Sequence, residues 1–328
     1  MAEVDERNVN YYLTTPTVES VPLSKLAGFT VFLKLENLQP PGSFKIRGIS
    51  HFCKKAVNER GCKRLICASG GNAGMAAAYA AQQLKTPCTI VLPESTPEFI
   101  AHKLRDYGAE VVVKGKVFDH ANQYALELAK QPGCEYVRPF DLPDVWEGHE
   151  SVIYECESQL KPVRPDVVIT CVGGGGLLNG ILQGMRSIGW DDIPVVAMET
   201  IGADCFNKSI EAGELITLPD ITSVAKSLGA LTVSSRTFDN YKIQKPPILS
   251  AVVPDRGGVN ACLNFADDHR YLVEPACGAT LAAIYSNVIQ RLQEEGKLGS
   301  VSNALVIVCG GSSVTLELLQ KWKNDFNL

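Results

Sequence analysis

Residues 167–178 read Val-Val-Ile-Thr-Cys-Val-Gly-Gly-Gly-Gly-Leu-Leu, and this stretch gives the strongest indication of the fold. Its first half is continuously apolar and β-branched, which is typical of a strand buried on both faces of a parallel sheet. A helical pattern over 177–188 follows directly, so the four glycines form the turn between strand and helix. Strand–turn–helix units of this kind build α/β folds, in which ligands bind beyond the carboxyl ends of the strands.

The same unit recurs along the chain. Strands are predicted at residues 30–35, 64–68, 88–92, 110–113, 166–171, 194–198, 271–273 and 304–309. Helices are predicted at 46–56, 73–84, 96–107, 121–130, 177–188, 276–292 and 314–322. This alternation predicts an α/β fold with two open, mainly parallel twisted sheets, right-handed crossovers and flanking helices.

The length of 328 residues suggests about two domains. Proline-rich stretches near 39–42 and 138–143 are candidate hinges. We therefore expect a small α/β domain, 39–142, inserted into a larger α/β domain formed by 1–38 plus 143–328. The segment 221–255 has no clear hydrophobic period, so no structure is predicted for it.

Composition excludes several classes of protein. The chain is 45% hydrophobic and 20% charged with a net charge of −5, which is ordinary for a globular protein and unsuited to binding nucleic acid or an anionic membrane. No apolar run approaches the roughly 18 residues of a membrane span. The polar, acidic residues 1–10 do not resemble a secretory signal, so a cytosolic protein is expected. Its 11 cysteines include no Cys-x-x-Cys pair and are expected to be reduced and mostly buried, and its 5 histidines show no zinc-binding spacing.

The turn at Gly173–Gly176 predicts an anion site. Consecutive glycines allow several backbone N–H groups to point at one anion, and the start of the following helix favours negative charge. Leu178 stands where a G-x-G-x-x-G motif needs its third glycine, and no Gly-Lys-Ser/Thr follows. A phosphate group is therefore expected, rather than a dinucleotide or nucleoside triphosphate. The alternative is a tight turn with no ligand.

Two further turns have the same place in a strand–helix unit. Residues 69–74 read Ser-Gly-Gly-Asn-Ala-Gly, and 309–313 read Cys-Gly-Gly-Ser-Ser. The first offers a hydroxyl, an amide and backbone N–H groups, which suits a carboxylate. Its alternative role is ordinary helix capping by Ser69 or Asn72.

Lys45 lies in residues 41–48, Pro-Gly-Ser-Phe-Lys-Ile-Arg-Gly. If Ser43 caps the following helix, Lys45 falls in the first turn, where the helix dipole disfavours an ammonium group. A neutral amine in that place could bond a carbonyl carbon. The alternative is an ordinary surface lysine.

Three more residues border the predicted strands and helices. Cys309 is either a core side chain or a thiol facing a ligand. Glu199 follows the strand 194–198 and could contact a ligand or ion, or be a solvated strand end. Glu274 precedes the helix 276–292 and could simply interact favourably with its N-terminus.

Taken together and in this order, the motifs resemble the fold-type II pyridoxal-phosphate enzymes, the tryptophan synthase β family. Within that family the sequence is most similar to the vertebrate serine dehydratase and serine dehydratase-like branch, over nearly the whole chain. Supporting stretches are 41–53, 145–149, 197–200, 218–228 and 272–285. The resemblance implies a lyase of amino-acid catabolism and gluconeogenesis that uses pyridoxal 5'-phosphate to convert serine to pyruvate, or threonine to 2-oxobutanoate, with release of ammonia. It also implies a cytosolic homodimer.

The resemblance further implies roles for individual residues. Lys45 would bind the cofactor covalently and act as the base on the substrate's Cα, with Phe44 beside it. The cofactor phosphate would bind backbone N–H groups of Gly173, Gly174, Gly175, Gly176 and Leu177. Asn72 would contact the ring hydroxyl oxygen, and Cys309 would face the pyridine nitrogen. The substrate carboxylate would bind at Ser69, Gly70, Asn72 and Ala73. Glu199 and Ala203 would lie at a monovalent-cation site, with K⁺ as the candidate ion.

Gly70 is a departure from the family pattern. The serine dehydratase branch usually has Ala at this position, and the serine racemase branch has a second Ser thought to act on the opposite face of the cofactor. Gly70 therefore argues against racemisation and puts high activity in doubt. Two alternatives stay open: a cofactor-binding protein with little or no turnover, and a β-replacement enzyme such as a cysteine or cystathionine synthase, which the Ser-Phe-Lys-Ile-Arg-Gly motif disfavours. No regulatory domain is expected after Cys309, because the chain ends at Leu328.

Overall fold

A computed structural model describes residues 9–328 and divides them into two units. The smaller unit contains residues 9–13 and Gln39–Gly148, and the larger contains Thr14–Leu38 and His149–Leu328. This division differs from the expected boundaries at 9–13 and 143–148. The difference at 143–148 arises because helix α6 (Pro143–Leu160) begins in the expected proline-rich hinge, proline being well suited to a first helical position. Most of residues 1–10, where no secretory signal was expected, lies outside the described residues.

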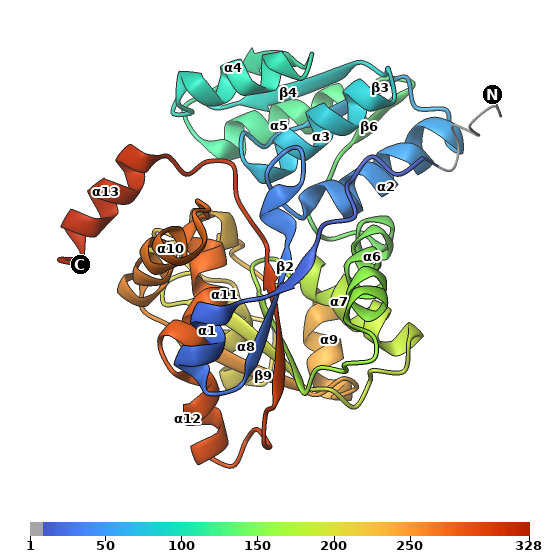
Figure 1. Cartoon of the computed structure of the whole chain (residues 1–328). Coiled ribbons are helices and arrows are strands. Elements are labelled where there is room, and N and C mark those ends of the chain that lie inside the picture. Colours follow the sequence, from blue (N-terminus) through green and yellow to red (C-terminus); the bar gives the residue numbers. More distant parts are fainter. Residues whose placement is uncertain (1–8) are drawn as a thin grey trace. The chain divides into compact units, whose positions relative to one another are not determined.

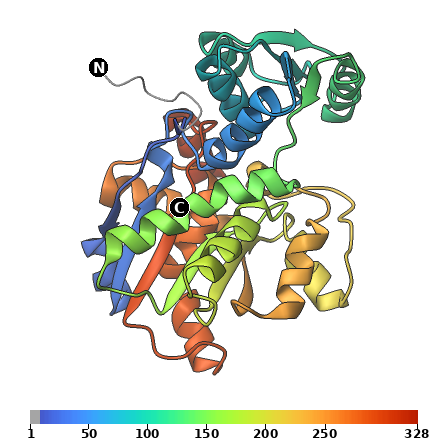
Figure 2. The same ribbon diagram turned by 90° about the vertical axis from the view of Figure 1, so that its right-hand side faces the viewer.

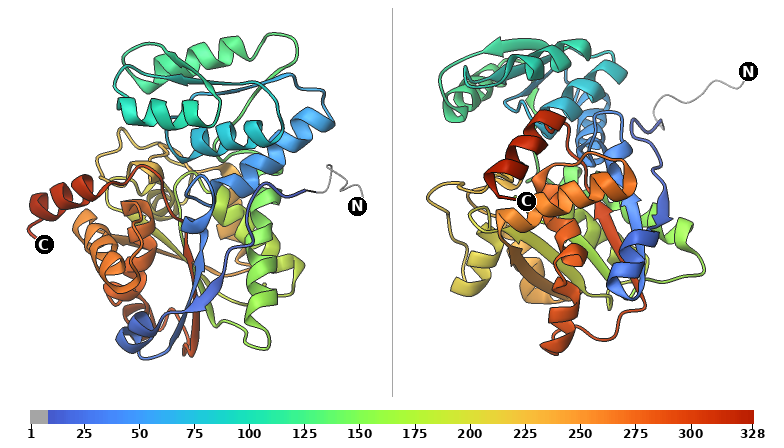
Figure 3. Two further views of the ribbon diagram at one scale, coloured as in Figure 1. Left: turned by 45° about the horizontal axis from the view of Figure 1, so that its top comes forward. Right: turned by 60° about the vertical axis from the view of Figure 1, so that its left-hand side comes forward.

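The larger unit contains a six-stranded sheet. Its order is β1 (Thr17–Glu19), β2 (Thr30–Leu35), β10 (Asn303–Val308), β7 (Val167–Cys171), β8 (Val195–Thr200) and β9 (Ile248–Val253). All neighbours are parallel except β1, which runs antiparallel to β2. Helices cover both faces (Figures 1 and 3). On one side lie α1 (Val21–Ala27), α10 (Asp255–His269), α11 (Pro275–Tyr285) and α12 (Val288–Glu294), and on the other lie α6, α7 (Gly176–Ser187) and α9 (Ser235–Ile243). This confirms the expected α/β architecture.

The smaller unit contains a four-stranded parallel sheet in the order β5 (Glu110–Val113), β4 (Cys88–Leu92), β3 (Arg64–Cys67) and β6 (Cys134–Tyr136). Its two faces have separate cores, as alternate side chains of β3 show: Leu65 packs with α2 (Lys45–Asn58), α3 (Asn72–Gln83) and α4 (Glu98–Asp106), while Ile66 packs with α5 (Phe118–Leu128). Figure 2 shows these helices around the sheet. Burial on both faces explains why the strands read as continuous apolar runs.

Two predictions about the elements were wrong. Residues 271–273 form no strand, because they connect helix α10 (Asp255–His269) to helix α11 (Pro275–Tyr285). The helix expected over 276–292 is broken into α11 and α12 (Val288–Glu294). Asn287 lies between them with φ +53°, a backbone conformation that an α-helix cannot contain.

Several elements had no counterpart among the predictions. The segment 221–255 contains the short turn η3 (Lys226–Leu228), helix α9 (Ser235–Ile243) and strand β9. The other unpredicted elements are β1, β6, η2 (Glu36–Leu38), α1 (Val21–Ala27), α6, α8 (Cys205–Ala212) and α10. Helix α13 (Leu316–Asp325), in contrast, was predicted, with bounds of 314–322.

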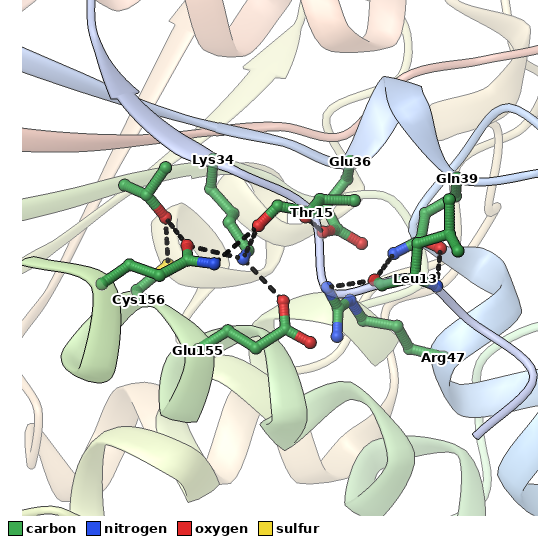
Figure 4. Close-up of polar contacts among 10 residues, drawn as sticks. Leu13, Thr15, Lys34, Glu36, Gln39, Arg47, Glu155 and Cys156 are labelled. Carbon is green, nitrogen blue, oxygen red and sulfur yellow. Dashed lines mark hydrogen bonds and ion pairs between the residues drawn. The ribbon is translucent and has the colours of Figure 1, made fainter. Parts of the chain in front are cut away.

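A buried charged network joins strand β2 to helix α6 in the larger unit (Figure 4). The ammonium group of Lys34 is fully buried and donates hydrogen bonds to the carbonyl oxygen of Thr15 and to Oε2 of Glu155, both at 2.6 Å. Thr15 also donates to the buried carboxylate of Glu36 at 2.5 Å. These partners compensate for the loss of water around the buried charges. Figure 4 also shows Arg47 of the smaller unit donating to the Leu13 carbonyl at 3.4 Å.

All eleven cysteines are free, and all are buried except the half-buried Cys134. Within residues 9–328, no helix has the length and apolar character needed to cross a bilayer. The same residues contain no cluster of three or more His, Cys, Asp or Glu side chains arranged to hold a metal ion.

Candidate active site

The turn between β7 and α7 (Gly176–Ser187) is shaped by close contacts that only glycine permits. Gly175 caps the helix with φ +92°, and a β-carbon on it would lie 1.9 Å from Oγ1 of Thr237. A β-carbon on Gly173 would lie 2.9 Å from the carbonyl oxygen of Leu228. The turn is therefore enclosed by other backbone and side-chain atoms, and larger residues would fill it.

The backbone N–H groups of this turn are available to a ligand. No described residue accepts a hydrogen bond from the N–H groups of residues 174–177. The first N–H groups of a helix have no partner inside the helix, and the helix dipole places partial positive charge there. Four such donors in succession fit a phosphate group.

A buried polar cluster holds the turn against helix α9. Oδ1 of the fully buried Asn179 accepts hydrogen bonds from Oγ1 of Thr237 and Nδ2 of Asn240, both at 3.0 Å. Arg186 donates to Oδ1 of Asn240 at 2.8 Å. None of these residues was predicted from the sequence to belong to the site. An asparagine on the apolar face of the predicted helix 177–188 was the available signal, because a buried amide requires partners.

Lys45 lies in the first turn of α2, as expected, and is its first residue, but Ser43 does not cap the helix. Phe44 occupies the cap position without a side-chain hydrogen bond, and Ser43 is buried. The ammonium of Lys45 donates to the Pro139 carbonyl at 2.6 Å and lies 5.3 Å from the centre of the Phe44 ring. Lys45 is therefore half-buried and anchored inside the smaller unit, which argues against an ordinary surface lysine.

The turn 69–74 joins β3 to α3 in the smaller unit. Its helix cap is Gly71, so neither Ser69 nor Asn72 acts as the expected alternative cap; Ser69 Oγ instead accepts from the Gly71 N–H at 3.2 Å. A β-carbon on Gly74 would lie 1.6 Å from the Ser69 carbonyl oxygen, so the helix begins directly against the turn. Ala73 is buried and Gly70 is half-buried.

The charge of Lys45 also reaches the end of β3. Burial raises the pKa of Cys67 to about 11, and Lys45 partly opposes this shift. Pro139, which accepts the hydrogen bond of Lys45, follows β6, the parallel neighbour of β3, so Lys45 and the turn 69–74 both lie toward the carboxyl ends of these strands, where ligands bind in sheets of this kind.

Cys309 follows β10 and lies in a group of buried thiols. Its sulfur lies 3.5 Å from that of Cys171, at the end of β7. Hydrogen bonding to Cys171 and Cys277, together with burial, raises the pKa of Cys309 well above its ordinary value. Cys309 is therefore a neutral thiol, able to donate only a weak hydrogen bond.

Glu199 is fully buried in β8, so the alternative of a solvated strand end is wrong. Its carboxylate accepts hydrogen bonds from the backbone N–H groups of Phe206 and Asn207, at 3.0 and 2.7 Å, in the first turn of α8. Burial raises the pKa of Glu199 to about 8, although these two hydrogen bonds oppose the shift. Glu199 thus caps a helix. Ala203 is buried and donates its N–H to the Thr200 carbonyl at 2.9 Å; the cation site stays a prediction.

The predicted site residues form two groups, one in each unit. Lys45, Phe44 and the turn 69–74 belong to the smaller unit. The glycines 173–176, Leu177, Cys309 and Glu199 lie near the carboxyl ends of the parallel strands β7, β10 and β8 of the larger unit. These residues supply a lysine amine, a row of backbone N–H donors for an anion and a neutral thiol. Such groups are expected in a site for a cofactor that carries an aldehyde and a phosphate.

Comparison with known proteins identifies the class. The family model described as "Pyridoxal-phosphate dependent enzyme" matches residues 10–310, and the chain belongs to this family.

Individual relatives narrow the comparison. The chain is 53% identical to human "Serine dehydratase-like", over 95% of this chain and 94% of that protein. It is 50% identical to bovine "L-serine dehydratase/L-threonine deaminase", over 97% of this chain and 96% of that protein. The solved structure of a fungal L-serine ammonia-lyase from Rhizomucor miehei is similar with a TM-score of 0.89, at 34% identity, covering 96% of this chain and 99% of that one.

Proposed function

We propose that this chain is a pyridoxal-phosphate-dependent ammonia-lyase acting on L-serine and L-threonine, with pyruvate or 2-oxobutanoate and ammonia as products. The observation that carries the proposal is the row of open backbone N–H groups at residues 174–177, in a turn that no larger side chain could occupy. The names of the relatives, serine dehydratase and threonine deaminase, support the choice of substrates.

The proposal assigns binding roles to the residues of both units. Residues 173–177 hold the cofactor phosphate. Lys45 would hold the cofactor through its aldehyde carbon and, once the substrate's amino group has taken its place there, would act as the base for the proton on the substrate's Cα. Phe44 lies beside the cofactor, and Asn72 hydrogen-bonds its ring hydroxyl oxygen. The substrate carboxylate binds at Ser69, Gly70, Asn72 and Ala73, where hydroxyl, amide and backbone N–H donors are close together.

Cys309 is proposed to select the reaction. The bound cofactor supplies an electron sink for the bond broken at Cα. Because Cys309 is a neutral thiol, it would leave a pyridine nitrogen held beside it unprotonated, and the electron sink would be correspondingly weak. A weak sink favours immediate departure of the β-hydroxyl over transamination.

The finer expectations complete the proposal: a cytosolic homodimer acting in amino-acid catabolism, with K⁺ bound near Glu199 and Ala203. The carboxylate of Glu199 is a suitable oxygen ligand when ionised. Gluconeogenesis is the expected metabolic setting, because pyruvate is the product from serine.

The test is the absorbance spectrum of the pure protein, followed by addition of L-serine and measurement of pyruvate. We expect a cofactor band, its loss in Lys45→Ala, and its retention in the control Lys116→Ala, an exposed lysine of the same unit. A purified protein that neither shows a band nor acquires one with added cofactor would contradict the proposal.

Two further measurements separate the alternatives. Supplying serine together with a thiol shows whether thioether formation outpaces keto acid, as in a β-replacement enzyme. Bound cofactor without keto acid from serine or threonine would indicate a protein that has lost turnover.

A further inference from the structure

Glu274 connects the glycine-rich turn 309–313 of the larger unit to the η3 segment that packs on the turn 173–177. It precedes α11 and is only 4% exposed. Its Oε2 accepts a hydrogen bond from Oγ of Ser227 at 2.6 Å, and its Oε1 accepts one from the backbone N–H of Ser313 at 2.8 Å. Each oxygen of the carboxylate therefore holds a different loop.

The first loop leads to the phosphate-binding turn. Ser227 belongs to η3, whose last residue, Leu228, is buried with its backbone against Gly173. A β-carbon on Gly173 would lie 2.9 Å from the Leu228 carbonyl oxygen and 3.0 Å from its Cα. The position of Ser227 therefore fixes one wall of the turn 173–177.

The second loop leads to Cys309. Gly311 has φ +133°, and a β-carbon there would lie 2.2 Å from Cγ and Cδ of Glu274. The backbone N–H of Glu274 also donates to the Gly310 carbonyl at 3.4 Å. The segment that follows Cys309 therefore lies directly on the Glu274 side chain.

We propose that Glu274 is a positioning residue that sets the spacing between the phosphate-binding turn 173–177 and Cys309. The cofactor is a rigid ring with its phosphate and its pyridine nitrogen at separate points, so both binding groups must be held at one separation. A buried carboxylate with a charge-assisted hydrogen bond to each loop is suited to fixing that separation. This role rests on the proposed function, and Glu274 acts through the two loops rather than on the reacting atoms.

The first experiment measures the loops themselves, in the cofactor-free full-length protein. Hydrogen exchange is compared among wild type, Glu274→Gln, Ser227→Ala and the control Glu317→Gln, an exposed first-turn glutamate of α13. The N–H groups of Ser234 and Asn179 donate to the carbonyl oxygens of Gly174 and Gly175, at 3.1 and 2.9 Å, so their exchange reports on the turn 173–177, while the N–H of Ser313 reports on the turn 309–313. In Glu274→Gln we expect exchange to become about tenfold faster at both sets of amides, since a lost charge-assisted hydrogen bond has effects of this order. Ser227→Ala should affect mainly Ser234 and Asn179. Unchanged exchange at both sets would overturn the inference.

The second experiment measures cofactor binding by titration with pyridoxal phosphate. Glu274→Gln should weaken binding about tenfold and shift the cofactor absorbance band, a typical size for a residue that orients a binding group. If Glu274→Gln does not fold, Ser227→Ala decides, with weaker binding expected and wild-type binding contradictory. Failure of the wild type to bind the cofactor would instead refute the proposed function, while normal wild-type binding with an unaltered Glu274→Gln band and affinity would refute only the role of Glu274.

Discussion

Oγ1 of Thr237 lies 1.9 Å from the position that a β-carbon on Gly175 would occupy. The hydroxyl of α9 is thus packed into the turn before α7, and its hydrogen bond to Asn179 keeps it there. The shape of the proposed phosphate site therefore depends on helix α9 as well as on the glycine turn itself.

Gly175→Ala should destabilise the protein and abolish cofactor binding. The variant combines left-handed backbone strain of about 1–2 kcal/mol with overpacking of about 1–3 kcal/mol. The control is Gly189→Ala, because Gly189 also has a left-handed backbone, φ +75°, but no atom within 4 Å of the added carbon. Urea denaturation should show a clearly larger loss for Gly175→Ala. Equal losses would mean that the contact with Thr237 has no energetic effect.

Gly70→Ala should fold with nearly unchanged stability and should tighten the turn. Gly70 is not in the left-handed region, and its added carbon would meet side-chain carbons of Leu92, Thr96 and Ile100 at 3.1–3.3 Å. Reduced freedom of the unfolded chain contributes about 0.4–1 kcal/mol, which offsets the tight packing. If Gly70 limits turnover by loosening the turn, pyruvate formation should rise. A fall in turnover with unchanged stability would contradict this reading.

Glu199 should make stability depend on pH. Its pKa is about 8 in the folded protein and near its ordinary value, about 4.5, when unfolded, so the fold favours the protonated carboxyl. The stabilisation from protonated Glu199 is fully present below the pKa of the unfolded chain and is lost as pH rises through the pKa of the folded protein. The free energy of unfolding then falls by no more than about 1.4 kcal/mol per pH unit.

This component should be missing from Glu199→Gln. Denaturation of both proteins between pH 5 and 8.5 measures the free energy of unfolding at each pH. If this free energy changed with pH in the same way in both proteins, the raised pKa of Glu199 would be contradicted. Repeating the series in K⁺ and in a bulky organic cation tests the proposed cation site, since bound K⁺ should stabilise the ionised form.

Alkylation should distinguish one cysteine from the rest. Cys134 is half-buried, while Cys309 is buried with a pKa well above its ordinary value because of its bonds to Cys171 and Cys277 and its burial. Since the thiolate is the reactive form, iodoacetamide should modify Cys134 first and Cys309 very slowly. Peptide mass spectrometry of the native protein measures both rates. Rapid modification of Cys309 would show that its thiol is accessible and ionised.

The parallel strands could be predicted because burial on both faces requires a continuous run of apolar or β-branched residues. Strands β4 and β5 were located to the residue, as continuous apolar or β-branched runs. Helix α9 left no such trace, because its few buried residues are Thr237, Phe238 and Asn240, two of them polar. Helix α6 was hidden by Pro143, which was taken as part of a hinge although proline also suits a first helical turn.

The candidate site shows the same limit. The glycine turns and Lys45 could be found because their chemistry lies in consecutive residues. The residues that support these turns could not be predicted, because they meet only in the folded chain. Thr237 of α9 donates a hydrogen bond to Asn179 of α7, and Ser227 of η3 donates one to Glu274, which precedes α11. Tertiary hydrogen bonds of this kind have no local sequence pattern.

The pairing of β2 with β10 bears on how the chain is made. Thr30 is matched with Asn303 and Leu35 with Val308, so two neighbouring strands of the larger sheet come from segments far apart in the sequence. During translation the inserted unit, complete at Gly148, can finish its core while the ribosome is still making the rest. The larger sheet must wait until β10 has been made, and its long-range pairing makes that step slow. Synthesis therefore leaves strand β2 without its central neighbour for most of its duration, a period in which chaperone protection is of greatest use.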